Sequence, residues 1–427
     1  MSKAPSLAES RAPVFDLTRQ GNKISFNGRF DITQFRRALT ALHDLITVRG
    51  YKDICLDFSN CEFTHAPPML ALAAAVETYQ GAGIDFDLLL PLDGQLNRLF
   101  YNCNWAHIIQ PSAYPLSQYQ SRVHMAALRF RTSEEQHELI EDLLNKLLAS
   151  ITDFERSHFK AIEWSISEIT DNVLVHSGAP RGGLIQLTAK RNVKQVEFVV
   201  CDSGIGIPQS LGSSGLKISS DVDALAKAVE QGITRDKSLG QGNGLFGSYQ
   251  IAVKSGGQFS VHSGNATLYY TAKTGMHTRG EAIPMIGTMV VCGIDYTLPL
   301  LLEDALKFKA GSGYTPVDLI ELKYENSNRG RVAFTLKNES ESLRARLAGT
   351  EVRNKLRNLM AFSPDSKIEV NFEGIHLISS SFADEVFGKL FLELGPVEFS
   401  ARIEFRNIDT TVKQLIDKAI VQRMATH

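Results

Sequence analysis

The sequence predicts an α/β protein of three successive domains, and three observations lead to this fold class. The chain has 427 residues, which at roughly 150 residues per domain is enough for about three hydrophobic cores. A composition of 43% hydrophobic and 22% charged residues is typical of a globular protein and excludes a disordered chain. Strand-length apolar runs alternate with helical patterns near both ends of the chain, as in α/β folds.

Charge and apolar runs exclude several classes of protein. The 45 Lys and Arg and the 47 Asp and Glu give a net charge of −2, so no overall basic field attracts nucleic acid or an anionic membrane. The longest apolar stretches, such as 67–76 and 285–294, are about half the roughly 18 residues that a membrane span needs. We expect a cytoplasmic protein, since the first residues lack the apolar core of a signal peptide. Five scattered cysteines favour reduced thiols over disulfides or a zinc site.

The N-terminal domain is predicted at residues 14–115, after a tail at 1–13 whose Pro, Ala and Ser content indicates disorder. Its apolar runs predict three strands, and its helical patterns predict two helices. The strands are expected at 23–26, 54–58 and 86–90, and the helices at 33–49 and 69–80. Proline and small polar residues at 114–121 indicate a linker.

The central domain is predicted at residues 125–302. Its first helix, at 139–151, carries a doubled apolar stripe that must be buried against the domain's own sheet or against a second subunit. A second helix is expected at 154–175, and strands at 184–189, 196–201, 258–262, 268–272 and 288–296. Residues 209–243 are rich in Gly, Ser and charge around one short helix at 222–230, which predicts a mobile loop.

The C-terminal domain is predicted at residues 312–427, and a second linker candidate at 309–316 overlaps its start. Residues 370–377 align without gaps with residues 56–63, giving a strand, a turn and an apolar step at identical offsets. This similarity predicts two copies of one α/β unit, one on each side of a central domain. Chance is the alternative, because short strand-turn-helix units are common in α/β proteins.

The first of three polar motifs lies in the second central helix. Spacings of four place Glu168, Asn172 and His176 along one helix face. A polar row on a helix full of Ile and Val points to a ligand or a water-filled cleft, and the alternative is a solvated face.

Two glycine motifs follow. Asp202-Ser-Gly204-Ile-Gly206-Ile-Pro208 lies at the end of an apolar strand, where glycines let the backbone approach a ligand and the carboxylate points into a cleft; the alternative is an Asp-capped turn. Gly240-Gln-Gly242-Asn-Gly244-Leu245 opens a helix, which aims backbone N–H groups at an anion such as phosphate. Each motif alone is weakly specific.

In this order, the three motifs resemble the GHKL ATPase superfamily, which includes gyrase, Hsp90, MutL, histidine kinases and the anti-sigma-factor serine kinases. The resemblance covers about residues 129–298. It implies that the central domain is a GHKL (Bergerat) α/β sandwich that binds ATP and Mg²⁺. Within it, Asn172 would ligate Mg²⁺ through its amide oxygen, and Glu168 would orient or deprotonate the nucleophile, either water or a hydroxyl.

The resemblance also implies a nucleotide-binding set. Asp202 would accept a hydrogen bond from the adenine amino group and reject guanine, while Thr288 helps hold adenine. Backbone N–H groups of the second glycine motif would cradle phosphates, and the first motif would leave room for the base. The cofactor-binding residues predicted in this way are Asn172, Asp202, Gly204, Gly206, Gly240, Gly242, Gly244, Leu245 and Thr288. Arg235 and Lys237, in the presumed lid, could reach the terminal phosphate or remain solvated.

Two features depart from the family pattern. The hairpin at 256–287 is longer than a minimal kinase module needs, and its loop at 274–280 has no role that the sequence indicates. His137 lies within the first helix of the ATPase domain, which leaves no room for a separate dimerisation hairpin and argues against a two-component sensor kinase.

The flanking domains resemble STAS-like domains. The C-terminal one is similar to an uncharacterised STAS-like family, and the N-terminal one more distantly to the STAS fold of anti-sigma-factor antagonists, in which a GHKL kinase phosphorylates a serine. Ser379, Ser380 and Ser381 occupy that place here. The alternative is that Ser381 is a helix N-cap with Asp384 at N3. The N-terminal copy has only Thr64 nearby, which favours scaffolding or partner binding.

Three functions are consistent with these motifs and resemblances. The first is a partner-switching serine/threonine kinase that acts on a STAS or regulator protein or on Ser379 to Ser381. The second is an ATP-hydrolysing conformational switch that controls a partner, in stress or phage defence, by moving a lid at about 209–241. The third is a nucleotide-sensing scaffold without turnover, which the presence of Glu168 disfavours. We expect ATP and a protein partner, no nucleic acid and no membrane, and a homodimer stays open.

Overall fold

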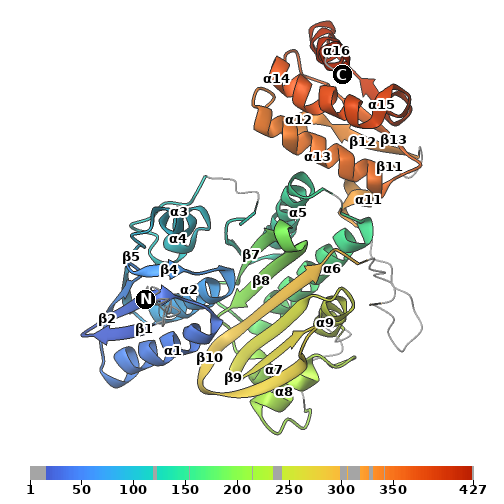
Figure 1. The fold of residues 1–427 in the computed structure, drawn as a ribbon. Coiled ribbons are helices and arrows are strands. Elements are labelled where there is room, and N and C mark those ends of the chain that lie inside the picture. Colours follow the sequence, from blue (N-terminus) through green and yellow to red (C-terminus); the bar gives the residue numbers. More distant parts are fainter. Residues whose placement is uncertain are drawn as a thin grey trace, which may run out of the picture.

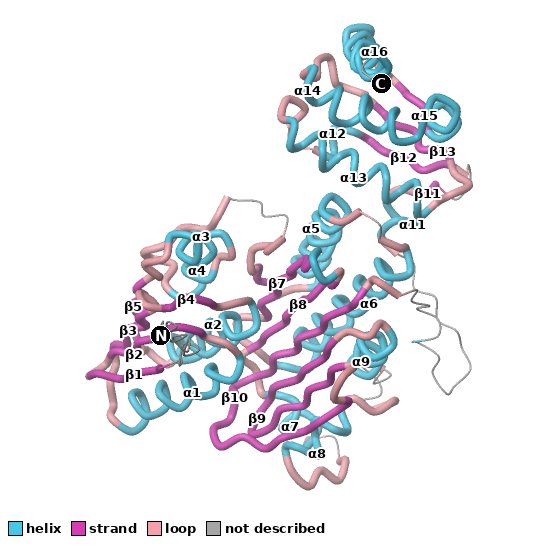
Figure 2. The backbone as a smooth tube through the Cα atoms, in the orientation of Figure 1, coloured by secondary structure: helices cyan, strands magenta, loops and turns pink. Residues whose placement is uncertain are grey.

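The computed structural model describes residues 16–118, 123–152, 154–213, 215–233, 243–298, 305, 318–326, 330–340 and 342–425. The described residues form a mixed α/β structure with three separate sheets, each made from residues of one predicted domain (Figures 1 and 2). The fold class predicted from the sequence is therefore confirmed.

The N-terminal sheet has the order β1-β2-β3-β5, with β4 beside β2. β1 is antiparallel to β2, whereas β2, β3 and β5 are parallel. The strands are β1 (Asp16–Gln20), β2 (Lys23–Arg29), β3 (Asp53–Asp57), β4 (Cys61–Phe63) and β5 (Asp85–Leu89). The helices are α1 (Ile32–His43), which runs into the π-helical turn η1 (Asp44–Val48), α2 (Ala66–Gly81), α3 (Gly94–Asn102) and α4 (Trp105–Ile109). The predicted strands and both predicted helices are present, and α3 and α4 are additional.

The central sheet is antiparallel throughout, in the order β6-β7-β8-β10-β9. Its strands are β6 (Leu128–Phe130), β7 (Gly183–Lys190), β8 (Gln195–Asp202), β9 (Gln258–Thr271) and β10 (Gly275–Asp295). Its helices are α5 (Ser133–Ser150), α6 (Arg156–Asn172), α7 (Gly206–Gly212), α8 (Asp221–Ala228) and α9 (Gly244–Lys254), with a π-helical turn η2 (Val173–Ser177) and a 3₁₀ turn η3 (Arg191–Val193).

The β9–β10 hairpin differs from the prediction. The two strands expected at 258–262 and 268–272 are one continuous strand, β9, and β10 starts at Gly275 rather than near 288. The stretch at 274–280 is thus mostly strand and not a loop, because its residues pair with 266–271 of β9.

The C-terminal sheet has the order β11-β12-β13-β14. The antiparallel β11–β12 pair is followed by parallel β12, β13 and β14, which is the arrangement of β1, β2, β3 and β5. The strands are β11 (Glu325–Asn326), β12 (Arg331–Thr335), β13 (Lys367–Asn371) and β14 (Ile403–Arg406). The helices are α11 (Leu319–Lys323), α12 (Leu336–Glu339), α13 (Arg346–Phe362), α14 (Ser380–Ala383), the π-helical turn η4 (Asp384–Gly388), α15 (Lys389–Arg402) and α16 (Thr410–Ala425).

The two flanking sheets share this strand order, and the aligned segments 56–63 and 370–377 begin in corresponding strands. Leu56 lies in β3 and Val370 in β13, the middle members of the two parallel runs. The aligned segments are therefore equivalent strands, whereas the likeness of the N-terminal domain to STAS domains stays a prediction.

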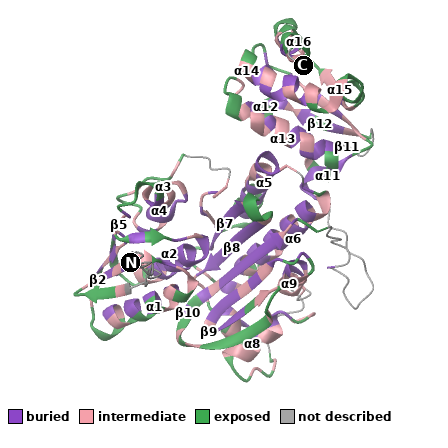
Figure 3. Cartoon of the chain, viewed as in Figure 1, coloured by how far each residue is buried: buried purple, intermediate pink, exposed green. Residues whose placement is uncertain are grey.

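The helix α2 explains how the N-terminal domain is attached. Its apolar run at 67–76 is buried on all sides, because the helix lies between the N-terminal sheet and the central sheet (Figure 3). Side chains of β8 alternate accordingly: Phe198 and Val200 belong to the core under α5 and α6, and Val199 to the core shared with α2. The second face of the central sheet is thereby covered within one chain.

The helix α5 explains how the C-terminal domain is attached. Its doubled apolar stripe packs against α6 and β7 and also against α13. Asn358 of α13 donates hydrogen bonds to the carbonyls of Leu148 and Ile151 at 2.8 and 2.7 Å, which satisfies the end of α5. The stripe therefore serves an intramolecular interface, not the second subunit considered from the sequence.

None of the helices in the described residues combines the length and apolar composition that crossing a membrane requires.

Candidate functional site

The helix α6 carries the first motif. Its apolar residues at spacings of three and four face the core, and Glu168 and Asn172 lie half-buried outside that stripe. The α-helix ends at Asn172, and a π-helical turn follows as far as Ser177. Because π-helical hydrogen bonds span five residues instead of four, the predicted polar row includes Glu168 and Asn172 but does not continue regularly to His176.

The carboxyl group of Glu168 has an unusual environment. Burial raises its pKa to about 7, and the nearby charge of Asp171 adds to this effect. Oε2 of Glu168 faces the Cα of Gly244, so closely that a Cβ atom on residue 244 would collide with it. The first and third motifs are therefore in direct contact, and Glu168 has the pKa of a general base that works near neutral pH.

Gln136 is a residue that the sequence did not single out. From α5, its Nε2 donates to Oγ1 of Thr170 at 2.7 Å and to Oδ1 of Asp171 at 2.8 Å. These bonds hold the turn of α6 that lies between Glu168 and Asn172. The only available signal was a glutamine within a helix rich in leucine.

Asp202 is the last residue of β8, and the sheet register places it opposite Thr288 of β10. Its side chain is 5% exposed, and its Oδ1 accepts a hydrogen bond from the N–H of Gly204 at 2.8 Å. Burial raises the pKa of Asp202 to about 6, although backbone N–H groups of Gly204 and Thr288 oppose the shift. A buried carboxylate beside a threonine is a specific acceptor for an amino group.

The glycines of the first motif are required by the protein's own packing. A Cβ on Gly204 would collide with the carbonyl of Ser177, to which Ile205 donates a backbone hydrogen bond at 2.9 Å. Gly206 has φ +77°, and a Cβ there would lie 2.7 Å from Oγ of Ser263. The first motif thus packs against the end of η2 and against β9.

Ser263 connects these parts and was also missed. Its Oγ donates to the carbonyl of Gly287 at 2.8 Å and accepts from the N–H of Ile207 at 2.9 Å. The same oxygen lies 3.1 Å from Oγ1 of Thr288. A serine inside a strand gives no sequence signal, because only the tertiary fold places it between the first glycine motif and the Gly287–Thr288 backbone.

The second glycine motif is only partly described. Gly240 and Gly242, like Arg235 and Lys237, lie outside the described residues. Gly244 and Leu245 open α9, and Leu245 packs partly buried against the central core. Gly244 therefore belongs to the candidate site because it contacts Glu168, whereas Leu245 packs against the core.

Two comparisons with protein families match parts of the chain. Residues 160–284 match the family of histidine kinase-, DNA gyrase B-, and HSP90-like ATPases. The matched range starts in α6, ends in β10 and contains all three motifs. It is a GHKL ATPase domain. ATP binding by this domain follows from that membership, as the sequence resemblance implied.

The C-terminal domain matches a second family. Residues 348–413, from α13 to the start of α16, match a STAS-like domain of unknown function, so this predicted domain type is confirmed. No curated protein matches the chain.

A Mg²⁺ ion suits the donor type that α6 supplies. Asn172 is half-buried at the end of the helix and carries an amide oxygen, and hard cations prefer such oxygen donors. In the described ranges, no group of three or more His, Cys, Asp or Glu side chains is arranged to hold a metal ion. Asn172 would therefore be the protein's ligand, with substrate phosphates and water supplying the others.

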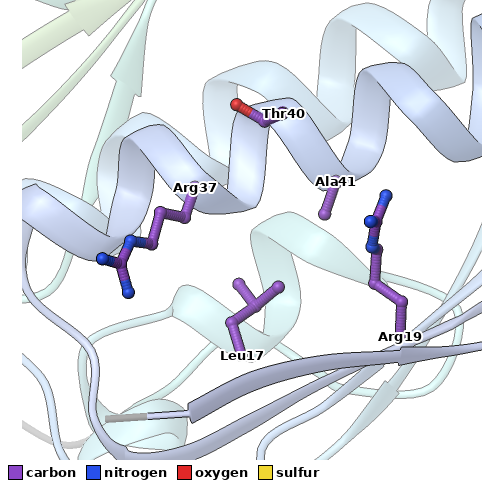
Figure 4. Close-up of a pocket in the computed structure, with 5 residues that line it drawn as sticks. All are labelled: Leu17, Arg19, Arg37, Thr40 and Ala41. Carbon is purple, nitrogen blue, oxygen red and sulfur yellow. The ribbon is translucent and has the colours of Figure 1, made fainter.

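A shallow pocket in the N-terminal domain is separate from this site. It has a volume of about 250 Å³ and lies between β1 and α1 (Figure 4). Its lining residues are Leu17, Arg19, Arg37, Thr40 and Ala41, none of which belongs to the three motifs.

Proposed function

We propose that this chain is a Mg-ATP-binding signalling protein whose central domain acts as a partner-switching serine/threonine kinase of the anti-sigma-factor type, in the cytoplasm. The observation that most directly supports transfer of the γ-phosphoryl group is the environment of Glu168. Its carboxyl group is largely buried, has a pKa of about 7 and contacts the glycine motif that opens α9. The STAS-like domain in the same chain supports the choice of a STAS-type protein as acceptor.

In this proposal, each described residue has one role. Asp202 accepts a hydrogen bond from the adenine amino group, and Thr288 supports this contact from the neighbouring strand. Asn172 would hold Mg²⁺, which when bound neutralises phosphate charge. Glu168 takes the proton of the acceptor hydroxyl while the hydroxyl oxygen bonds to the γ-phosphorus. The bond between the γ-phosphorus and the oxygen that bridges it to the β-phosphate breaks, which releases ADP.

The acceptor serines of the C-terminal domain differ in accessibility. Ser379, not Ser381, is the N-cap of α14: its Oγ accepts from the N–H of Phe382 at 3.0 Å and donates to the carbonyl of Arg344 at 2.8 Å. Ser380 is exposed and therefore the best acceptor of the three. Thr64, in the N-terminal domain, is only 3% exposed, which argues against phosphorylation there.

A second candidate is an ATP-hydrolysing switch that controls a partner. It is favoured by α6, which carries Glu168 and Asn172 in its second half and binds the C-terminal domain through its first half. Arg156 forms ion pairs with Asp318 at 2.9 Å and with Glu325 at 2.6 Å. Hydrolysis of the bound nucleotide could therefore shift α6 and change how the STAS-like domain packs against it.

The deciding experiment follows the γ-phosphate. The full chain is incubated with Mg²⁺ and γ-labelled ATP, alongside Glu168→Ala and Asp202→Ala. Label on a serine or threonine of the protein or of a co-purifying partner supports the kinase, and free phosphate that depends on Glu168 supports the switch. Bound but unconverted ATP supports a nucleotide-sensing scaffold, and absence of ATP binding would overturn all three.

A further inference from the structure

The β9–β10 hairpin has an interrupted ladder beside the adenine end of the site. Gly280 pairs with Ala266, the next pair is Met285 with Gly264, and the one after is Thr288 with Ser263. β10 therefore has more residues than β9 over this stretch, and the backbone bulges between Gly280 and Thr288. The bulge ends at Gly287 and Thr288, directly opposite Asp202.

Arg36 of the N-terminal domain enters this bulge from α1. Its Nη1 donates to the carbonyl of Ile283 at 3.2 Å, and its Nη2 donates to the carbonyl of Ala266 at 3.3 Å and to Oγ1 of Thr267 at 3.0 Å. One guanidinium thus joins the two strands where their own ladder is interrupted. A planar fork of donors can make this bridge, whereas a lysine ammonium lacks that geometry.

Charged neighbours hold the guanidinium in place. Arg36 and Glu281 side chains are each 11% exposed and lie 3.9 Å apart. Burial opposes ionisation of Glu281, but hydrogen bonds from Arg279 and Thr267 and the charge of Arg36 keep its pKa below the usual value. His262, which contacts Thr267 at 3.1 Å, is buried, and burial lowers its pKa to about 3, so it stays neutral. The cluster is therefore a paired, desolvated contact between domains and not a solvated surface.

From the bulge, short contacts lead to the adenine end. Ser263 bonds the carbonyl of Gly287 at 2.8 Å and lies 3.1 Å from Oγ1 of Thr288. Gly287 has φ +76°, and its Cα is so close to the carbonyl of Asp202 that no side chain fits there. The position of the Gly287–Thr288 backbone thus determines how Thr288 faces Asp202.

We propose that Arg36 is a positioning residue for adenine recognition: by bridging the bulge, the N-terminal domain holds Gly287 and Thr288 in register with Asp202. The unexplained length of the hairpin then has a role, which is to carry the docking point for α1. This inference rests on the proposed nucleotide site and adds to it the control of base affinity by the N-terminal domain.

The test compares full-length wild type with Arg36→Met and with the matched control Arg37→Met. Arg37 is the neighbouring, exposed arginine on α1 and only lines the shallow pocket (Figure 4). Binding of ATP is measured by calorimetry, and amide hydrogen exchange is measured without nucleotide. Thr267→Val, which removes one of the three Arg36 contacts, serves as a milder variant in case Arg36→Met does not fold.

We expect Arg36→Met to weaken ATP binding about tenfold and Thr267→Val about threefold, with Arg37→Met unchanged. Exchange should increase at residues 283–288 and not in α6 or α9. Unchanged ATP affinity in folded Arg36→Met, or exchange that rises equally throughout the central domain, would overturn the positioning role. If wild type itself does not bind ATP, the proposed function fails instead.

Discussion

Glu168 and Gly244 are in contact across the candidate site: a side chain on residue 244 would meet the Glu168 carboxylate, with Cδ of Glu168 only 3.3 Å from the added Cβ. The glycine therefore sets where the carboxylate can lie. Glycine motifs before helices are usually explained by phosphate binding to backbone N–H groups. Here the last glycine has a second reason to lack a side chain, which is the space that the Glu168 carboxylate, the proposed general base, occupies.

Gly244→Ala should displace the Glu168 carboxylate and slow ATP turnover by about tenfold to a hundredfold. The closest contact involves Oε2 at the free end of the side chain, and Cβ of Glu168 would lie 3.2 Å away, so we expect the free energy of unfolding to change by only about 1 kcal/mol. Gly212→Ala is the matched control, because nothing lies within 4 Å of the Cβ it adds. Turnover that survives Gly244→Ala would show that Glu168 does not need this position.

The pH dependence of turnover should report Glu168. Its carboxylate is the active form, so kcat/KM for ATP should rise through pH of about 7 and level off above it. Asp171→Asn removes the charge that helps raise this pKa while leaving an oxygen for Gln136, and it should move the rise to lower pH. A profile that is flat between pH 5 and 9 would contradict a base at Glu168.

Asp202 should make the protein less stable as the pH rises. Its pKa is raised from 3.8 to about 6 in the folded state, so the folded state binds the proton more tightly than the unfolded state. The resulting destabilisation is absent below pH 3.8, grows between pH 3.8 and 6, and is complete above 6, at about 3 kcal/mol.

Asp202→Asn removes this pH dependence, which denaturant unfolding at pH 4 and pH 7 measures. The same variant should bind ATP at least about tenfold more weakly, because an amide cannot supply a carboxylate's charge-assisted bond. If the variant retains the wild-type difference in stability between the two pH values, Asp202 is not its source.

Arg156→Met should weaken the attachment of the C-terminal domain. Asp318 is 2% exposed and, among the residues that the structure describes, would keep Lys160, at 3.6 Å, as its cation. Breaking a buried pair in this way costs about 3 kcal/mol, which should appear as lower thermal stability. Arg344→Met, an exposed arginine of the same domain, is the control and should leave the transition unchanged.

We expect the serines at the start of α14 to have different roles, with Ser379 stabilising the helix and Ser380 accepting phosphate. Ser379→Ala removes the N-cap and should lower stability by about 1 kcal/mol. Ser380→Ala should leave stability unchanged but abolish any label that γ-labelled ATP places on this domain. Label that persists in Ser380→Ala and disappears in Ser379→Ala would assign the acceptor to the cap instead.

Much of the fold could be predicted because its signals are local. The periodicity of α6 and the alternation or continuity of apolar residues in β7 and β8 follow from helix and strand geometry. The hairpin was predicted less well, because residues 277–280 are polar or glycine, have no strand pattern of their own and form a strand by pairing with β9. The N-cap of α14 was placed two residues late for a similar reason, since Ser379 and Ser381 are equivalent in sequence and differ only in their contacts.

The sequence by itself determined the three motifs, their order and hence the ATPase domain, because residue type and spacing along one helix, one strand end and one loop carry that chemistry. Only the tertiary structure decided which groups meet. Gly244 faces Glu168, Ser263 joins the first glycine motif to Gly287, α2 fills the space between two sheets, and Arg36 bridges the bulge of another domain. These are contacts between residues far apart in the chain, and their geometry depends on how whole sheets and helices pack, which no local pattern encodes.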